Sequence, residues 1–133
     1  MNRLKGTIIS IQQSNELSQV DVACDDVMAT AYVLGKLNNL NLKIGDEVFL
    51  LFKESEVALA KNLKGSISLR NRFDGVIEKI VYGELLAEVT LLFKNDKIVS
   101  IISRRACESM KLKEKDKVTA LVKSNEMTLL KSS

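Results

Sequence analysis

Apolar and polar residues alternate in short runs along the whole chain, and these runs occur in two similar sets. In the second half they cover residues 76–81, 85–93, 98–103, 118–123 and 127–130. Runs of this length with a period of two predict β-strands that bury one face. Between the third and fourth runs, Ala106, Met110 and Leu112 are spaced as on a helix and predict one or two helical turns. The corresponding segment of the first half is residues 35–42.

The two sets of runs are copies of one unit. Residues 6–11 (GTIISI) match residues 75–80 (GVIEKI) 69 positions later. Farther along the chain the offset is 70, as in the pairs Asp46 and Asp116, Lys53 and Lys123, and Lys61 and Lys131. A one-residue shift between residues 34 and 40 reconciles the two offsets. The sequence therefore predicts two tandem repeats, 1–63 and 64–133.

Five short strands with a helix before the fourth, in fewer than 70 residues, are typical of a small Greek-key barrel. We therefore predict an all-β protein made of two tandem five-stranded barrels of the OB-fold type, each with a short helix before its fourth strand. A closed barrel also leaves no open sheet edge in so short a unit. A β-sandwich is the alternative that the pattern leaves open.

The composition excludes several kinds of chemistry. The chain has 133 residues, of which 46% are hydrophobic and 28% charged, as in a folded soluble protein. It has no His, so it has no His base or His metal ligand, and two cysteines cannot form a four-cysteine zinc site. Cys24 and Cys107 are interpreted as reduced, partly buried thiols. Without a signal peptide or a long apolar run, the expected location is the cytoplasm.

Charge is divided unequally between the repeats. Residues 1–65 carry 7 basic and 8 acidic side chains, whereas residues 66–133 carry 13 basic and 9 acidic ones. All of the excess positive charge of the chain therefore belongs to the second repeat. An anion is expected to bind there.

Three segments of the second repeat are rich in hydrogen-bond donors. In the first, Ser66, Ser68 and Arg70 would share one face of a strand. The others are residues 100–103 (SIIS) and 121–124 (LVKS), which place hydroxyls and an ammonium at strand ends. Arg presents a planar fork of N–H groups and stays charged. No carboxylate interrupts these segments, as a site for a dianion requires.

The same motifs resemble a known family. The pattern SxSxRN before Gly75, then SIIS, then VTALVKS at 118–124, is similar to the molbindin or Mop family of TOBE-type molybdate-binding domains, and the tandem copies resemble its di-domain members. The resemblance implies an OB-like fold, a symmetric oligomer and molybdate or tungstate bound between domains. It assigns oxyanion binding to Ser68, Arg70, Asn71, Ser103, Ala106, Lys123 and Ser124. Ala106 replaces a hydroxyl residue and offers only its backbone N–H.

The first repeat departs from this motif set. Its counterparts are Asn2 for Asn71, Leu34 for Ser103, Lys53 for Lys123 and Glu54 for Ser124. The Ser-x-Arg segment has no counterpart, and Glu54 would repel a dianion. We therefore expect the first repeat to be a scaffold and the chain to bind about one anion. Ser68 and Arg70 would come from one chain, and Lys123 with Ser103 from another.

The sequence thus predicts a non-enzymatic, intracellular molybdate- or tungstate-binding protein that serves storage, homeostasis or sensing. No other cofactor, no direct nucleic-acid partner and no membrane are expected. The protein should form a homo-oligomer, with a trimer favoured over a dimer. Two alternatives remain: an OB-type nucleic-acid-binding module, which only 5% aromatic residues makes less attractive, and an accessory domain of an oxyanion transport system.

Overall fold

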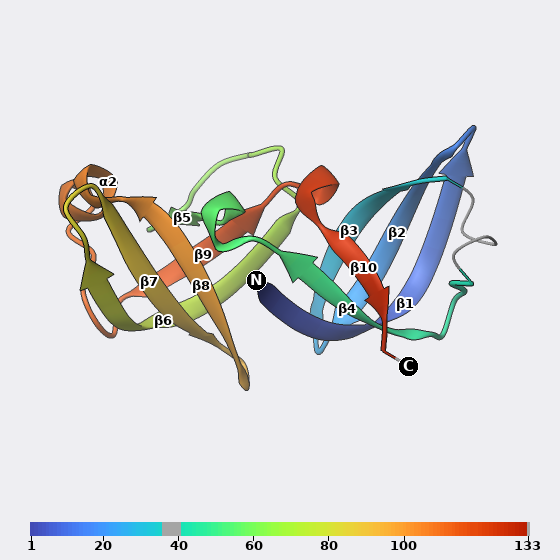
Figure 1. The fold of residues 1–133 in the computed structure, drawn as a ribbon, viewed down its shortest axis with the longest axis horizontal. Coiled ribbons are helices and arrows are strands. Elements are labelled where there is room, and N and C mark those ends of the chain that lie inside the picture. The colour runs from blue at the N-terminus through green and yellow to red at the C-terminus, as the bar shows by residue number, and fades with distance from the viewer. Residues whose placement is uncertain (36–40, 133) are drawn as a thin grey trace.

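Two strongly curled β-sheets lie side by side in the computed structural model, which describes residues 1–35 and 41–132 (Figure 1). The first sheet has the strand order β10-β4-β1-β2-β3 and the second has the order β5-β9-β6-β7-β8. All neighbouring strands within a sheet are antiparallel. This arrangement confirms the prediction of an all-β protein with two OB-like barrels.

The strands correspond closely to the predicted runs. The first half contains β1 (Asn2–Ser14), β2 (Leu17–Cys24), β3 (Val27–Leu34), β4 (Glu47–Phe52), the 3-10 turn η1 (Glu54–Glu56) and β5 (Ala58–Ala60). The second half contains β6 (Asn71–Tyr82), β7 (Leu86–Phe93), β8 (Asp96–Ser103), α2 (Arg104–Ser109), β9 (Lys117–Val122), η2 (Ser124–Glu126) and β10 (Thr128–Lys131). Helix α2 is the predicted helix of the second repeat. Most of its expected counterpart, at 35–42, lies outside the described residues.

The first long strand of each sheet, β1 or β6, bends, and this bend closes the barrel. β1 pairs with β4 at its start and with β2 farther on, and β6 pairs with β9 and β7 in the same way. Gly6 and Gly75 stand at the bends. A Cβ on Gly6 would lie 2.5 Å from Val22 Cγ1, and one on Gly75 would lie 2.7 Å from the Leu92 carbonyl oxygen. Only glycine allows this close approach, which brings β3 against β10 and β8 against β5.

One edge strand of each sheet comes from the other repeat. After η1 the chain crosses to the second sheet, where β5 pairs with β9. After η2 it crosses back, and β10 pairs with β4. Two ion pairs hold the exchanged ends: Lys61 Nζ lies 3.1 Å from Asp116 Oδ2, and Lys131 Nζ lies 3.6 Å from Asp46 Oδ2. Each repeat therefore supplies four strands to one sheet and one strand to the other.

Two equivalent asparagines join the sheets. Asn71 donates to the carbonyl of Thr30 at 2.9 Å and accepts from its amide at 2.7 Å. Asn2, which is 69 positions earlier, makes the same two bonds to Val99 at 2.8 Å each. We call these two contacts the asparagine clamps. A single hydrophobic core runs through both units.

Cys24 and Cys107 are free, buried thiols, as predicted. Burial raises the pKa of Cys24 to about 11, with smaller contributions from Asp25 and Asp96. Within residues 1–35 and 41–132, no helix has the length and apolar character needed to cross a membrane. The same residues contain no group of three or more Cys, Asp or Glu side chains placed to hold a metal ion.

Candidate functional site

A pocket of about 510 Å³ lies where the two repeats meet. Its volume is in the range of small-molecule sites. One side is formed by the second repeat, with residues Ser68, Leu69, Arg70, Lys123, Ser124 and Asn125. The other side is formed by β2 and β3 of the first repeat, with residues Gln19, Asp21, Thr30 and Tyr32. Four of the seven predicted oxyanion residues thus line one pocket.

The segment that carries Ser68 and Arg70 is irregular. The prediction of a strand at 66–70 was wrong, because β6 begins only at Asn71. The guanidinium of Arg72 instead holds the segment, with Nε donating to the Leu69 carbonyl and Nη2 to the Ile67 carbonyl, both at 3.1 Å. Exposure still alternates along the segment, so Ser68 and Arg70 remain exposed to the pocket.

Lys123 and Ser124 lie at the crossing from β9 to β10. Lys123 precedes η2, and its carbonyl accepts the amide of Glu126 at 3.0 Å, which fixes the turn. In the described part of the chain, neither Arg70 nor Lys123 has an acidic partner within 4.0 Å. Two cations without ion-pair partners and two hydroxyls therefore line the same pocket. We call Ser68, Arg70, Lys123 and Ser124 the cationic edge.

The opposite side of the pocket carries a carboxylate that the sequence did not predict. Asp21 and Thr30 are direct partners on β2 and β3, and Thr30 Oγ1 donates to Asp21 Oδ1 at 2.7 Å. The donor-rich segments contain no carboxylate, but folding brings one to face them. The alternation of β2 indicated which side chains share a face, and no signal in the sequence showed what that face meets.

Asn71 follows Arg70 in the sequence but does not line the pocket. It is fully buried, and both polar atoms of its amide bind the backbone of Thr30. It therefore positions Thr30, which lines the pocket.

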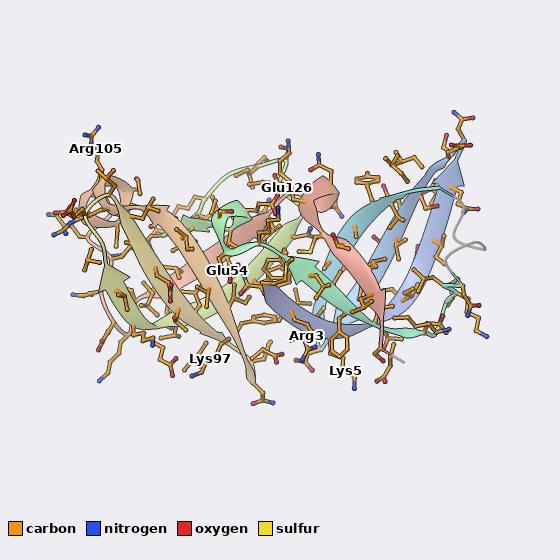
Figure 2. The ribbon with its side chains drawn as sticks, viewed as in Figure 1. Arg3, Lys5, Glu54, Lys97, Arg105 and Glu126 are labelled. Carbon is orange, nitrogen blue, oxygen red and sulfur yellow. The ribbon has the colours of Figure 1, made fainter. Side chains whose placement is uncertain are left out.

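Ser103 and Ala106 lie away from this pocket, at the end of β8 and on α2. Ser103 Oγ accepts the amide of Ala106 at 3.0 Å and caps the helix. Ser103 lines a separate hollow of about 840 Å³, together with Arg104 and Arg105. Figure 2 shows Arg105 projecting from the far end of the second barrel. The structure therefore separates Ser103 from the cationic edge, and it brings Ser68, Arg70 and Lys123 of one chain to the same pocket.

Two glutamates at equivalent positions meet where the chain crosses between the sheets. Glu56 ends η1 and Glu126 ends η2. A hydrogen bond with Glu56 raises the pKa of Glu126, burial and the charge of Glu56 raise it further, and the ammonium of Lys123 acts in the opposite direction. Glu126 lies near the middle of the molecule, between the barrels (Figure 2). The two carboxylates therefore lie close enough to affect each other, two residues after Ser124 of the cationic edge.

In the first repeat, a carboxylate stands at a position where the cationic edge has a hydroxyl. Lys53 and Glu54 stand where Lys123 and Ser124 stand in the second repeat. The Glu54 carboxylate accepts a hydrogen bond from the amino group of Met1 at 2.6 Å, and this bond lowers its pKa. A carboxylate at this place is unsuited to a dianion, in agreement with the sequence-based expectation.

Comparison with known proteins identifies the family. The TOBE domain profile matches residues 1–59 and again residues 67–129. The chain belongs to the TOBE domain family. The two TOBE matches follow the two sequence repeats rather than the two sheets, because each sheet takes one edge strand from the other repeat.

Two relatives have molybdenum in their names. The chain is 28% identical over 131 residues to the molybdenum transport protein ModE of Azotobacter vinelandii, covering 96% of this chain and 48% of ModE. It is 38% identical over 66 residues to molybdenum-pterin-binding protein 3 of Clostridium pasteurianum, covering 49% of this chain and 97% of that protein. This chain thus spans about half the length of ModE.

A solved structure shares the whole architecture. The cytoplasmic molybdate-binding protein ModG, in a crystal form with molybdate bound, superposes with a TM-score of 0.92 at 26% identity. The superposition covers 97% of this chain and 94% of ModG. The chain therefore belongs to the TOBE domain family and has the fold of ModG, a protein that binds molybdate.

Proposed function

We propose that this chain binds molybdate or tungstate at the cationic edge, without catalysing a reaction. The observation that carries the proposal is that Arg70 and Lys123, both without ion-pair partners among the described residues, share one pocket with the hydroxyls of Ser68 and Ser124. The molybdate bound to ModG and the name of ModE support this choice of anion. The physiological role is storage, homeostasis or sensing of the oxyanion in the cytoplasm.

The mechanism is electrostatic attraction followed by hydrogen bonding. A tetrahedral dianion presents only acceptor oxygens, and a buried charge must be matched by donors. The guanidinium of Arg70 supplies a fork of N–H groups, Lys123 supplies an ammonium, and the serines supply hydroxyl protons. Sulfate has the same charge and shape, so cavity size must distinguish it from the larger anions.

A neighbouring copy completes the site in this proposal. The hydroxyl of Ser103 and the amide of Ala106 lie at the opposite end of the second barrel, where they can approach the cationic edge only of another chain. The assembly is a homo-oligomer, with a trimer favoured over a dimer. Because Ser103 uses its oxygen to accept from Ala106, its O–H remains able to donate. Within each chain, repeat 64–133 supplies the cationic edge, and repeat 1–63 supplies the opposite wall.

Calorimetric titration with molybdate, tungstate and sulfate tests this function. Arg70→Ala should weaken molybdate binding by about 10-fold or more, because a hydrogen bond to a charged group contributes roughly 1.5–3 kcal/mol. Arg3→Ala is the matched control. Arg3 lies over the ring of Phe49, 4.6 Å from its centroid, and its removal takes away the same charge outside the pocket. Equal affinities in Arg70→Ala and the unaltered chain would show that the anion binds elsewhere.

A further inference from the structure

The pocket has an acceptor on one side and donors on the other. Asp21 lines it opposite the cationic edge. Thr30 donates its hydroxyl to Asp21 Oδ1 at 2.7 Å, and the clamp from Asn71 holds the backbone of Thr30 on both its amide and its carbonyl. The carboxylate is thus held by a chain of hydrogen bonds that ends in a buried side chain. Among the described residues, Asp21 Oδ2 accepts no side-chain hydrogen bond and remains available.

A second polar pair continues this wall. Gln19 and Tyr32 are the next partners on the same face of β2 and β3, and Tyr32 donates its hydroxyl to Gln19 Oε1 at 2.7 Å. The amide nitrogen of Gln19 remains a donor. Asp21 is therefore the one ionised acceptor among the ten residues that line the pocket.

The carboxylate is specific to the first repeat. The position of Asp21 corresponds to Thr90 in the second repeat, and the position of Thr30 corresponds to Val99. Neither Thr90 nor Val99 carries a charge. The strand pairing is the same, with Thr90 opposite Val99. The fold therefore does not require an acid here, because the equivalent strand pair forms without one.

A carboxylate that faces a bound anion distinguishes oxyanions by their protons. Ionised Asp has acceptor oxygens only. Molybdate, tungstate and sulfate are fully ionised at neutral pH, so an oxygen of any of them that faces Asp21 forms an acceptor–acceptor contact. Inorganic phosphate and arsenate keep at least one O–H at neutral pH and can donate it to the carboxylate. A hydrogen bond to a charged acceptor is among the stronger ones.

We propose that Asp21 is a specificity-determining residue that admits singly protonated tetrahedral oxyanions and weakens the binding of fully ionised ones. The proposal rests on the proposed function, because it requires the cationic edge to hold the anion. It adds hydrogen phosphate and hydrogen arsenate to the ligand class of the pocket. It also makes the first repeat a determinant of selectivity.

The test compares molybdate, sulfate and inorganic phosphate on the unaltered chain and on Asp21→Asn, at pH 8 and fixed ionic strength. Removal of the charge should tighten the binding of molybdate and sulfate about 5-fold or more. The repulsion between two unit charges at contact distance is about 1 kcal/mol even in water. Phosphate should gain nothing or bind more weakly, because it loses its acceptor. The ratio of the phosphate Kd to the molybdate Kd should therefore rise about 10-fold.

Two further variants keep the result interpretable. Asp25→Asn removes the same charge from the exposed β2–β3 turn, outside the pocket, and should leave the ratio unchanged. Asp21→Thr introduces the residue found at the equivalent position, Thr90, and should change the affinities in the same way as Asp21→Asn. It replaces Asp21→Asn in the test if that variant folds poorly. Thermal melts establish folding in each case.

The outcomes separate this inference from the proposed function. If all three anions tighten by the same factor, Asp21 acts only through its charge and the inference is wrong. It is also wrong if molybdate binds but phosphate does not bind the unaltered chain. If none of the anions binds, the proposed function fails together with it.

Discussion

The two barrels have the same strand order, the same asparagine clamps and equivalent ion pairs, but only the second repeat supplies a cationic edge. The positions that are identical in both repeats hold the fold together: Gly6 and Gly75 at the bends, Asn2 and Asn71 in the clamps, Asp46 and Asp116, and Lys61 and Lys131 in the ion pairs. In the pocket, Lys123 is also repeated, as Lys53, but Ser124 is replaced by Glu54 in the first repeat, and Asp21 corresponds to Thr90 of the second. The shared positions therefore maintain the fold, and a few substitutions distinguish the pocket from its counterpart.

The comparison also changes the role of the first repeat. The sequence-based interpretation made it a scaffold, because it lacks the Ser-x-Arg segment and carries Glu54. The structure shows that its strands β2 and β3 form one wall of the pocket on the second repeat's cationic edge. The site therefore belongs to both repeats, and the four predictions that follow test how far the two halves differ.

The largest effect should come from breaking a clamp. Asn71→Ala leaves the amide and carbonyl of Thr30 without partners in a buried setting, and each buried unsatisfied group costs about 1–3 kcal/mol. We expect a loss of about 3 kcal/mol in the free energy of unfolding, measured by urea denaturation. Asn2→Ala should cost a comparable amount through Val99. A negligible effect of either substitution would show that the clamps are not equivalent.

Replacing each of the two equivalent lysines by alanine should show that only one of them contributes to anion binding. Lys123→Ala removes a charged donor from the pocket and should weaken molybdate binding about 10-fold or more. Lys53→Ala removes the equivalent exposed lysine beside Glu54 and should leave affinity within about 2-fold. Calorimetric titration of both variants measures the difference. Equal losses would mean that the two crossings both contribute to anion binding.

Ser103 should prove to be a helix cap as well as a candidate ligand. Ser103→Ala removes the acceptor for the amide of Ala106 and should lower the free energy of unfolding by about 1 kcal/mol, the usual contribution of an N-cap. Ser109→Ala, at the other end of α2, is the control and should be nearly neutral. If anion affinity also falls in Ser103→Ala alone, Ser103 donates to the anion from a neighbouring chain.

The smallest effect concerns the pH dependence of stability. Because the pKa of Glu126 is raised in the folded state above its ordinary value of 4.5, folding favours its protonated form. That contribution is present below the ordinary pKa and is lost as the pH rises through the raised one. In Glu126→Gln, the free energy of unfolding should therefore fall less as the pH rises above 4.5. The difference should be about 0.5 kcal/mol or less, because Glu56 and Glu126 are partly exposed. Glu56→Gln should have the same effect on the pH dependence, because it removes the partner of Glu126. Glu114→Gln is the control and should leave the pH dependence unchanged.

Much of the fold could be predicted from the sequence because its strands are regular. Alternation places residues such as Val20, Val22, Val89 and Leu91 on buried faces, and all four are inaccessible to solvent. The cationic segments were also predictable, since charge, hydroxyls and spacing are local properties. The boundary between the repeats at residue 63 remains a prediction, because each sheet contains strands from both sides of it.

Only the tertiary structure decided which strand completes each sheet and what faces the cations. The segments Ala58–Ala60 and Thr128–Lys131 have similar patterns and equivalent positions, so alternation fits either of them to either sheet. Their exchange depends on the direction in which η1 and η2 carry the chain. In the same way, Asp21 is an ordinary polar residue on an alternating strand, and it reaches the pocket because Asn71 joins the sheets through Thr30. Local sequence determines which face of a strand a side chain occupies, whereas contacts between distant segments determine which neighbour that face meets.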